Sequence, residues 1–94
     1  MSKRPDTESS VTTLYALQTC SHCKDTKQLL QENGIAFRTV YVDMLVGEER
    51  NDTMRYLRRI NPSVSFPTLV VGEETIVGFK KKKIEAALQA LANR

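Results

Sequence analysis

Hydrophobic residues occur along the chain in runs and in periodic spacings that predict alternating strands and helices. Residues 11–17 are β-forming and apolar almost without a break, which is typical of a strand buried on both faces. From Cys20 onward the apolar residues follow helical spacing as far as Gly34, and glycine favours a helix end because it accepts a left-handed backbone. Thr19 and Ser21 are the two candidates for the cap of this helix.

One side of this helix is predicted to pack and the other to face water. The packed stripe consists of Cys23, Thr26, Leu30 and Asn33, and Leu29 lies beside it. The opposite side consists of Lys24, Asp25, Lys27, Gln28 and Glu32. The helical period therefore buries Cys23, and Cys20 lies at or before the first turn.

The rest of the chain completes an α/β order. The remaining predicted elements are a strand at 35–43, a helix at about 48–60, strands at 67–71 and 75–79 and a helix at about 81–92. A strand, a helix and a strand in succession imply a right-handed crossover and a parallel strand pair. Pro62 stops the middle helix, and Gly72 lies in the turn of a predicted β-hairpin. The order β-α-β-α-β-β-α predicts one four-stranded sheet with helices on both faces.

Length and composition agree with one globular domain. The chain has 94 residues, of which 40% are hydrophobic and 27% charged, and this excludes the disordered and collagen-like classes. We expect residues 1–10 to be a disordered tail and residues 11–94 to be the domain. No apolar run approaches the roughly 18 residues of a transmembrane helix, and the first ten residues lack the apolar core of a secretory signal. We therefore expect a cytoplasmic protein that does not associate with membranes.

The positive charge is concentrated near the end of the chain. The formal net charge is +3, and Lys80–Lys83 supply it, because the first 79 residues carry nine basic and ten acidic groups. This distribution does not favour a nucleic-acid partner, which requires basic residues spread over a face. Two interpretations of the lysine run stay open: docking of an acidic partner close to Cys20, or a solvated run of charges.

The two cysteines, Cys20 and Cys23, carry the chemistry that the pattern predicts. Two intervening residues in helical geometry bring their sulfurs within bonding range. The first thiol meets the unpaired N–H groups and the positive dipole end of the helix, which favour thiolate, whereas the second is buried one turn further on and stays protonated. The pair is suited to dithiol–disulfide exchange, with Cys20 as the nucleophile and Cys23 as the resolving thiol.

The residues between the cysteines, Ser21 and His22, are expected to tune the reduction potential. A histidine at this position adds partial positive charge beside Cys20 and stabilises its thiolate, which makes the disulfide more oxidising. Replacement of His22 by alanine is then expected to lower the reduction potential. The alternative is an exposed histidine in the first turn without a redox role.

Metal binding is the main competing interpretation of the cysteine pair. Structural zinc requires four ligands, usually from two such pairs, and this chain has one pair and one adjoining histidine. We therefore expect no metal site within a single chain. The alternative function is an iron–sulfur cluster or metal-holding scaffold that bridges two chains through Cys20. A purely structural disulfide would stabilise the fold little, because the loop that it closes is very short.

The chain contains the segments LYALQTCSHC (14–23), SFPT (65–68) and VGF (77–79). With these segments it resembles a glutaredoxin-like protein of the thioredoxin superfamily. The resemblance covers residues 11–92 and implies a mixed sheet of strand order 2-1-3-4 flanked by three helices. It also implies that Pro67 is cis and lies against the cysteines, and that the backbone of Phe66 bonds the substrate like an added strand. The substrate-binding residues that it implies are Phe66, Pro67, Thr68, Gly78 and Phe79.

Two departures from typical glutaredoxins concern the binding of glutathione. Those proteins place a lysine three residues before the first cysteine, where this chain has Leu17, and they follow the last strand with a second glycine and acidic residues, where it has Phe79 and lysines. The Gly-Phe-basic sequence resembles the NrdH-type redoxins, which thioredoxin reductase reduces and which supply electrons to ribonucleotide reductase. Unlike those proteins, this chain has an insertion at 44–53 and Ser-His between its cysteines.

The residues and the resemblance together predict a small cytoplasmic monomer that reduces protein disulfides through a mixed disulfide on Cys20. Its expected partners are disulfide-containing proteins and a reductant, either a thioredoxin reductase-like enzyme or glutathione. No resident cofactor is expected, because the redox-active disulfide between Cys20 and Cys23 itself carries the electrons.

Overall fold

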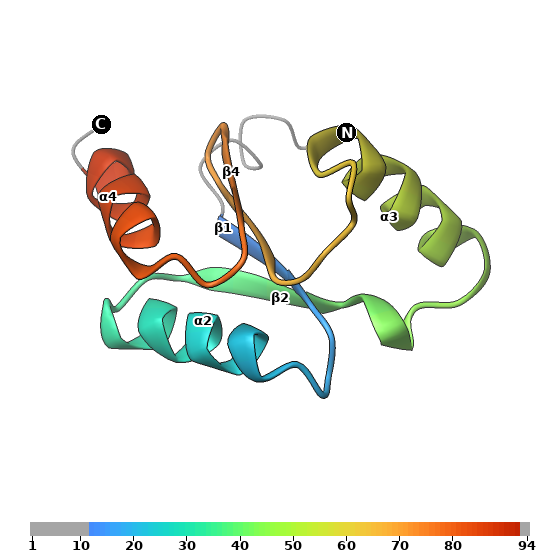
Figure 1. The fold of residues 1–94 in the computed structure, drawn as a ribbon, viewed down its shortest axis with the longest axis horizontal. Helices are drawn as coiled ribbons and strands as arrows, with labels where there is room; N and C mark the ends of the chain where they lie inside the picture. Colours follow the sequence, from blue (N-terminus) through green and yellow to red (C-terminus); the bar gives the residue numbers. More distant parts are fainter. Residues whose placement is uncertain (1–11, 93–94) are drawn as a thin grey trace.

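The fold is known from a computed structural model that describes residues 12–92 (Figure 1). In chain order the elements are β1 (Thr12–Ala16), α2 (Ser21–Glu32), β2 (Phe37–Tyr41), the 3₁₀ turn η1 (Val42–Met44), α3 (Gly47–Ile60), β3 (Thr68–Val71), β4 (Glu74–Val77) and α4 (Lys81–Ala92). The predicted order β-α-β-α-β-β-α is confirmed. The predicted disordered tail at 1–10 lies outside the described residues.

The four strands form one mixed sheet in the order β2-β1-β3-β4. β1 pairs with β2 in parallel, and β3 pairs with β1 and with β4 in antiparallel fashion. The sheet order that the resemblance implied is therefore confirmed. Tyr15 pairs with Thr68, and Thr68 pairs with Val77. The loops that follow β1 and β4 and the loop that precedes β3 consequently meet at one edge of the sheet. This edge is formed by the ends of the strands and not by an outer strand.

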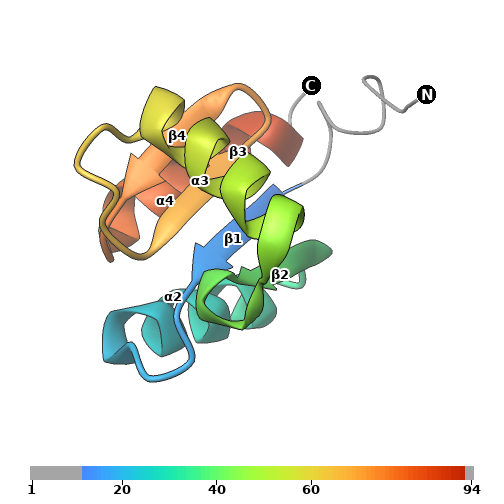
Figure 2. The ribbon, with the colours of Figure 1, turned by 90° about the vertical axis from the view of Figure 1, so that its right-hand side faces the viewer.

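Helices α2 and α4 pack on one face of the sheet, and α3 packs on the other (Figures 1 and 2). Every second residue of β1 and β3 points to the α2–α4 face, as the pleat of a strand dictates. The buried cluster on this face consists of Leu14, Ala16, Cys23, Leu29, Leu30, Leu69, Val71, Ile76, Ile84, Ala87 and Leu88. On the other face the rings of Tyr15 and Tyr56 of α3 lie 5.9 Å apart between centroids. Strand β1 is thus covered on both faces, as predicted.

The third strand ends at Val71 as predicted, and the other strand ends differ from the predicted ends by one or two residues. The second strand stops at Tyr41, because Val42–Met44 turn into a 3₁₀ helix. The fourth strand stops at Val77, because Gly78 adopts a left-handed backbone with φ of 85°.

Helix α2 also differs from its prediction at both ends. Its cap is Cys20 rather than Thr19 or Ser21. At the other end Asn33, predicted on the packed stripe, is exposed and donates its side-chain amide to the carbonyl of Leu29 at 2.8 Å. Asn33 therefore ends the helix instead of packing. Within residues 12–92, no helix combines the length and the apolarity needed to cross a bilayer.

Candidate active site: two thiols at the start of a helix

Cys20 is the N-cap residue of α2 and lies just before its first turn. Its backbone is extended, and its Sγ accepts a hydrogen bond from the backbone N–H of Cys23 at 3.2 Å. A sulfur thus does the work of the side-chain oxygen that caps most helices. The side chain is half-buried and packs against the core. This position leaves the sulfur partly accessible and places it at the positive end of the helix dipole.

Cys23 lies one turn further into α2, and its side chain is only 3% exposed. Burial raises the pKa of this thiol to about 12, and its hydrogen bond with Cys20 acts in the same direction. The nearby charges of Cys20 and Asp43 raise the pKa further, against a lowering contribution from the backbone of Leu17. Both cysteines are free thiols in this structure. The pair therefore combines one accessible sulfur with one buried thiol that keeps its proton.

The loop before β3 brings Phe66 and Pro67 to the edge of the sheet that carries Cys20. The peptide bond between them is cis, as the resemblance implied. Because Thr68 pairs with Tyr15, Pro67 comes level with Ala16, the last residue of β1 before the cysteine loop. Phe66 is half-buried and packs against the core.

The segment after β4 joins the same edge. The backbone N–H of Gly78 donates to the carbonyl of Pro67 at 2.9 Å. The next side chain, Phe79, is 36% exposed. The fold therefore brings together three segments that lie far apart in the sequence, namely the cysteine loop, the cis-proline loop and the Gly-Phe segment.

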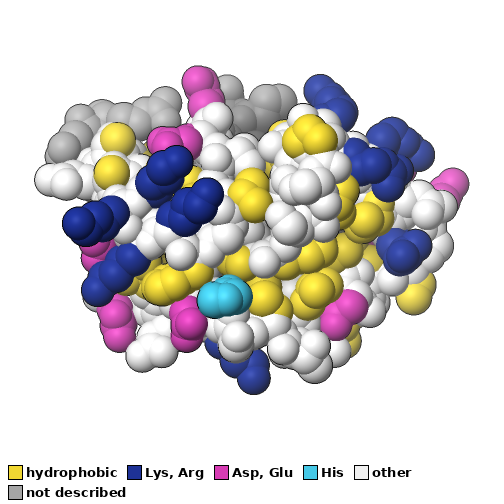
Figure 3. Space-filling model, in the orientation of Figure 1, with side chains coloured by type: hydrophobic (Ala, Val, Ile, Leu, Met, Phe, Trp, Pro, Cys, Tyr) yellow, Lys and Arg dark blue, Asp and Glu magenta, His cyan; other side chains and the backbone are white. Residues whose placement is uncertain are grey.

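The predicted site residues differ in what they offer to another molecule. Ser21 and His22 are exposed in the first turn of α2, next to Cys20. Pro67 and Thr68 are buried, and the Thr68 hydroxyl donates to the carbonyl of Ser65 at 2.8 Å. The side chain of Thr68 thus supports the loop, and its role in substrate binding stays a prediction for its backbone. Figure 3 shows a band of hydrophobic side chains on both sides of the single histidine, which is coloured cyan.

Asn61 is a structural residue of the site that sequence reasoning missed. It is 4% exposed, and its side-chain amide donates to the carbonyl of Ser65 and to the hydroxyl of Thr68, both at 3.0 Å. These two acceptors flank the cis Phe66–Pro67 bond. From the sequence, Asn61 is only a helix-ending residue before Pro62. Its contacts become visible only when the chain has turned back into β3.

Asp43 is the second residue that sequence reasoning missed. It follows β2, whose carboxyl end lies beside that of β1 because the two strands are parallel. Its Oδ2 accepts a hydrogen bond from the backbone N–H of Gln18, in the loop before Cys20, at 3.2 Å. The available signal was an acidic residue at the end of a strand predicted to lie parallel to the cysteine strand.

No cluster of three or more histidine, cysteine, aspartate or glutamate side chains with the spacing of a metal site occurs in residues 12–92. The chemistry that the described residues support is that of the two thiols. Their sulfurs are held by the same helix turn, one accessible and one buried, beside a cis-proline loop. This arrangement defines a redox protein of the thioredoxin fold.

The family model for glutaredoxin matches residues 12–76, and the chain belongs to the glutaredoxin family. It is similar to the crystal structure of the glutaredoxin from Methanosarcina mazei Go1, with 47% identity, a TM-score of 0.79 and coverage of 85% of this chain and 79% of that chain. The methanoredoxin of Methanosarcina acetivorans is 46% identical, with a TM-score of 0.79 and coverage of 84% of each chain. No curated protein matches the chain.

The NrdH-redoxin from Escherichia coli is 23% identical, with a TM-score of 0.67 and coverage of 80% of this chain and 91% of that chain, and it shows the shared fold alone. The predicted family is therefore confirmed, and with it the class of activity, thiol–disulfide oxidoreduction.

Proposed function

We propose that this protein reduces disulfide bonds of other proteins, with Cys20 as the attacking thiol and Cys23 as the resolving thiol. The observation that carries the proposal is the difference in burial and protonation between the two sulfurs. The Cys20 sulfur is partly accessible and already accepts a hydrogen bond from the N–H of Cys23, whereas the Cys23 thiol is buried with its pKa raised to about 12.

The reaction proceeds in two exchange steps. The Cys20 thiolate attacks one sulfur of the substrate disulfide, forms a mixed disulfide and releases the other substrate sulfur, which takes a proton from water. Cys23 then loses its proton and attacks the Cys20 sulfur, which forms the Cys20–Cys23 disulfide and releases the second substrate thiol. Two electrons pass from the protein dithiol to the substrate.

The first step prepares the second. Two of the causes that hold the proton on Cys23 are the hydrogen bond with Cys20 and the charge of Cys20. Both are removed when the Cys20 sulfur enters a mixed disulfide, because that sulfur becomes neutral and its bonding changes. The pKa of Cys23 is therefore lower in the intermediate than in the free dithiol, and the resolving thiolate forms when it is needed.

The test is a comparison of two variants with a peptide disulfide as substrate. Cys20→Ser is expected to lower the rate of reduction by at least about a hundredfold, as loss of a nucleophile does. Cys23→Ser is expected to form one equivalent of mixed disulfide that mass spectrometry detects and that persists until an external thiol is added. Full activity of Cys20→Ser, or a mixed disulfide on Cys23 instead, would refute the assignment.

We further propose that the protein works as a cytoplasmic monomer without a resident cofactor, reduced by a thioredoxin reductase-like enzyme rather than by glutathione. Support comes from Leu17 and Phe79, which replace the glutathione-binding residues of typical glutaredoxins. Reduction of the oxidised protein is followed with each reductant in parallel, and fast turnover with glutathione contradicts this choice. An absorbance band after anaerobic purification would instead indicate a cluster bridging two chains through Cys20.

The proposed tuning role of His22 has its own measurement. Its side chain is exposed beside Cys20, so water screens the partial positive charge that it adds, and His22→Ala is expected to lower the reduction potential by about 10–20 mV. Equilibration with a glutathione redox buffer gives the potential. His22→Gln, which keeps a polar side chain without the charge, should give the same value as alanine. An unchanged potential removes His22 from the mechanism.

A further inference from the structure

The outer edge of the sheet carries a groove that the proposed redox steps do not use. It lies between β4 and α4 and has a volume of about 340 Å³. Its lining consists of Glu74, Thr75, Ile76, Val77, Lys80, Lys83 and Ala86. Because β4 is the last strand in the sheet order, its outer edge has no strand partner in the described part of the chain. Such an edge offers backbone N–H and C=O groups to an added extended segment.

Four consecutive lysines border one end of this groove. Lys80–Lys83 are all exposed, and two of them, Lys80 and Lys83, line the groove itself. Among residues 12–92 none of the four is in an ion pair; the pair that occurs there joins Arg55 to Asp52. Figure 3 shows basic side chains gathered over α4, on the face that also carries the histidine and the hydrophobic band. The lysine charges are therefore available to another molecule.

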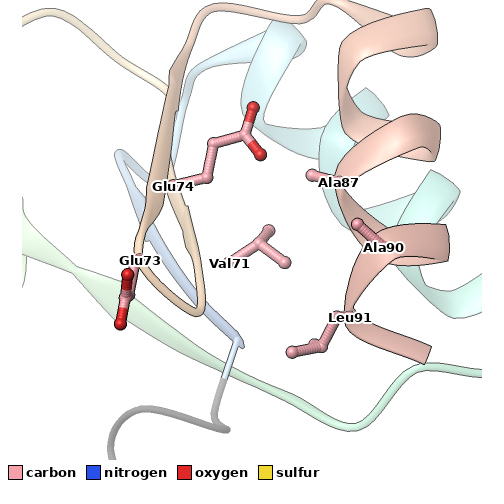
Figure 4. A pocket seen from close by; sticks show the side chains of 6 residues that line it. All are labelled: Val71, Glu73, Glu74, Ala87, Ala90 and Leu91. Atoms are coloured by element: carbon pink, nitrogen blue, oxygen red, sulfur yellow. The ribbon is translucent and has the colours of Figure 1, made fainter. Parts of the chain in front are cut away.

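The opposite end of the contact between β4 and α4 is acidic. Figure 4 shows a second cavity, of about 350 Å³, between the β3–β4 turn and α4. Glu74 reaches across it toward Ala87, and Glu73 lies at the turn. The charge along this side of the molecule thus changes from positive near Lys80 to negative near Glu74.

The positive end of the groove is the end closest to the thiols. The hydrogen bond from Gly78 to Pro67 ties the end of β4 to the cis-proline loop. In the sheet order β4 is two strands from β1, which leads into Cys20. Neighbouring strands lie about 4.8 Å apart, so a segment added to β4 lies about 14 Å from β1, a span that about four extended residues cover.

We propose that the groove binds an extended, acidic segment of the substrate protein, with the acidic residues about three to five positions from the reactive cysteine. The inference rests on the proposed function as a protein-disulfide reductase and specifies its substrates. Acidic side chains at this spacing meet Lys80 and Lys83. Acidic side chains much further from the cysteine meet Glu74 and are repelled.

The experiment uses the full chain, in its reduced form, and synthetic peptides that carry one cysteine as a mixed disulfide with 5-thio-2-nitrobenzoate. The protein dithiol is oxidised to the Cys20–Cys23 disulfide, and each peptide disulfide is reduced to a peptide thiol and coloured 5-thio-2-nitrobenzoate. The peptides carry glutamates about four residues from the cysteine, the same glutamates about nine residues away, or glutamines in their place. Each peptide is made in two versions, with the glutamates or glutamines before or after the cysteine. The rate of the faster version is used for the comparison between peptides.

The near-glutamate peptide is expected to react about five- to tenfold faster than the glutamine peptide at low salt, and the difference should shrink at high salt. The far-glutamate peptide should show no advantage. In Lys80→Glu/Lys83→Glu the ratio of the two rates is expected to fall to about one or below. An unfolded dithiol would also react with these activated disulfides without preference, so circular dichroism is recorded for the variant, and the wild-type rates with near and far glutamates test the proposal independently of any variant.

Two further double variants have the same change in net charge. Lys81→Glu/Lys82→Glu alters the same turn but spares the groove, and Arg58→Glu/Arg59→Glu alters exposed residues of α3 on the other face of the sheet. Both are expected to keep most of the preference. Equal loss in all three variants would overturn the groove in favour of a general field. Equal rates for all peptides in the wild type would refute any preference for acidic segments.

Failure of the inference differs from failure of the proposed function. If the wild type reduces every peptide at one rate and Cys20→Ser reduces none, the function stands and the groove assignment is refuted. If Cys20→Ser is as fast as the wild type, the proposed function itself is refuted.

Discussion

Helices α2 and α4 begin at the same edge of the sheet and pack on the same face, yet their first turns are built in opposite ways. The start of α2 holds a sulfur that accepts the N–H of Cys23 at 3.2 Å and so satisfies the helix end internally. The start of α4 holds Lys80–Lys83, whose charges oppose the helix dipole and find no carboxylate in the described part of the chain.

This difference between the first turns of α2 and α4 suggests different roles for the two helix ends. At α2 the helix field acts on an atom of the protein itself, the sulfur that is proposed to carry out the exchange. At α4 the lysines oppose the helix dipole and form no ion pair within residues 12–92, and the proposal above directs their charge at an acidic segment of a substrate protein. In the two proposals, one helix end supplies chemistry and the other supplies recognition.

The largest expected effect comes from the proton on Cys23. Its pKa is raised from 9.0 to about 12 in the fold, so the native state holds this proton more tightly than the unfolded chain. The contribution to stability is complete below about pH 9 and is lost as the pH rises toward 12, up to about 4 kcal/mol in the free energy of unfolding. Urea unfolding of the reduced protein and of Cys23→Ser, across this range, isolates the effect. Parallel pH profiles of the two proteins would contradict it.

A smaller loss of stability is expected from a substitution that loosens the cis-proline loop. Asn61→Ala removes the two hydrogen bonds that its amide donates to Ser65 and Thr68, which keep only the bond between themselves, so we expect the free energy of unfolding to fall by about 1–3 kcal/mol. The Michaelis constant for peptide disulfides should rise more than the turnover number falls, because the loop is displaced while the thiols are not. Ser63→Ala, which removes a part-buried bond to Asn61 and an exposed bond to the Ser65 hydroxyl, is the control and should cost less than about 0.5 kcal/mol.

The cap of α2 is tested by two substitutions that both remove the reactive thiol. Cys20→Ser keeps an acceptor for the N–H of Cys23, whereas Cys20→Ala does not. The serine variant should therefore be more stable by about 1 kcal/mol, the usual value of a side-chain cap. Urea unfolding under reducing conditions measures the difference, and equal stability would mean that the sulfur does not act as a cap.

The smallest effect is expected at α4. Lys81→Ala/Lys82→Ala removes two cations from the positive end of the helix dipole and introduces a strong helix former. The free energy of unfolding should rise by about 0.5–1 kcal/mol at low salt, and the gain should shrink at high salt. A loss of stability instead would show that these lysines have a structural role, contrary to the contrast with α2.

Much of the fold was predictable because its signals are local. Helical spacing at 81–92 predicted α4 with the bounds that the structure has, and the same spacing put Cys23 on the packed side of α2, where it is buried. Strand order and the cis bond before Pro67 were accessible only through the resemblance to glutaredoxins. Periodicity shows which face of an element is buried, but it contains nothing about which strand lies beside which.

The residues that were missed depend on contacts across the fold. Asp43 reaches the cysteine loop because β2 lies parallel to β1, and Asn61 bonds Thr68 because the chain reverses between them. In both cases the residue type is unremarkable for its local segment. Their partners are selected by tertiary packing, which no local pattern records.

The sequence by itself determined the two thiols, their helix and the lysine run, because capping, helical period and charge are properties of neighbouring residues. Only the tertiary structure decided that the cis-proline loop, Asp43 and a groove beside β4 gather around them. The physical reason is that these contacts form when distant segments bury their apolar faces against one sheet, so they depend on the packed fold as a whole.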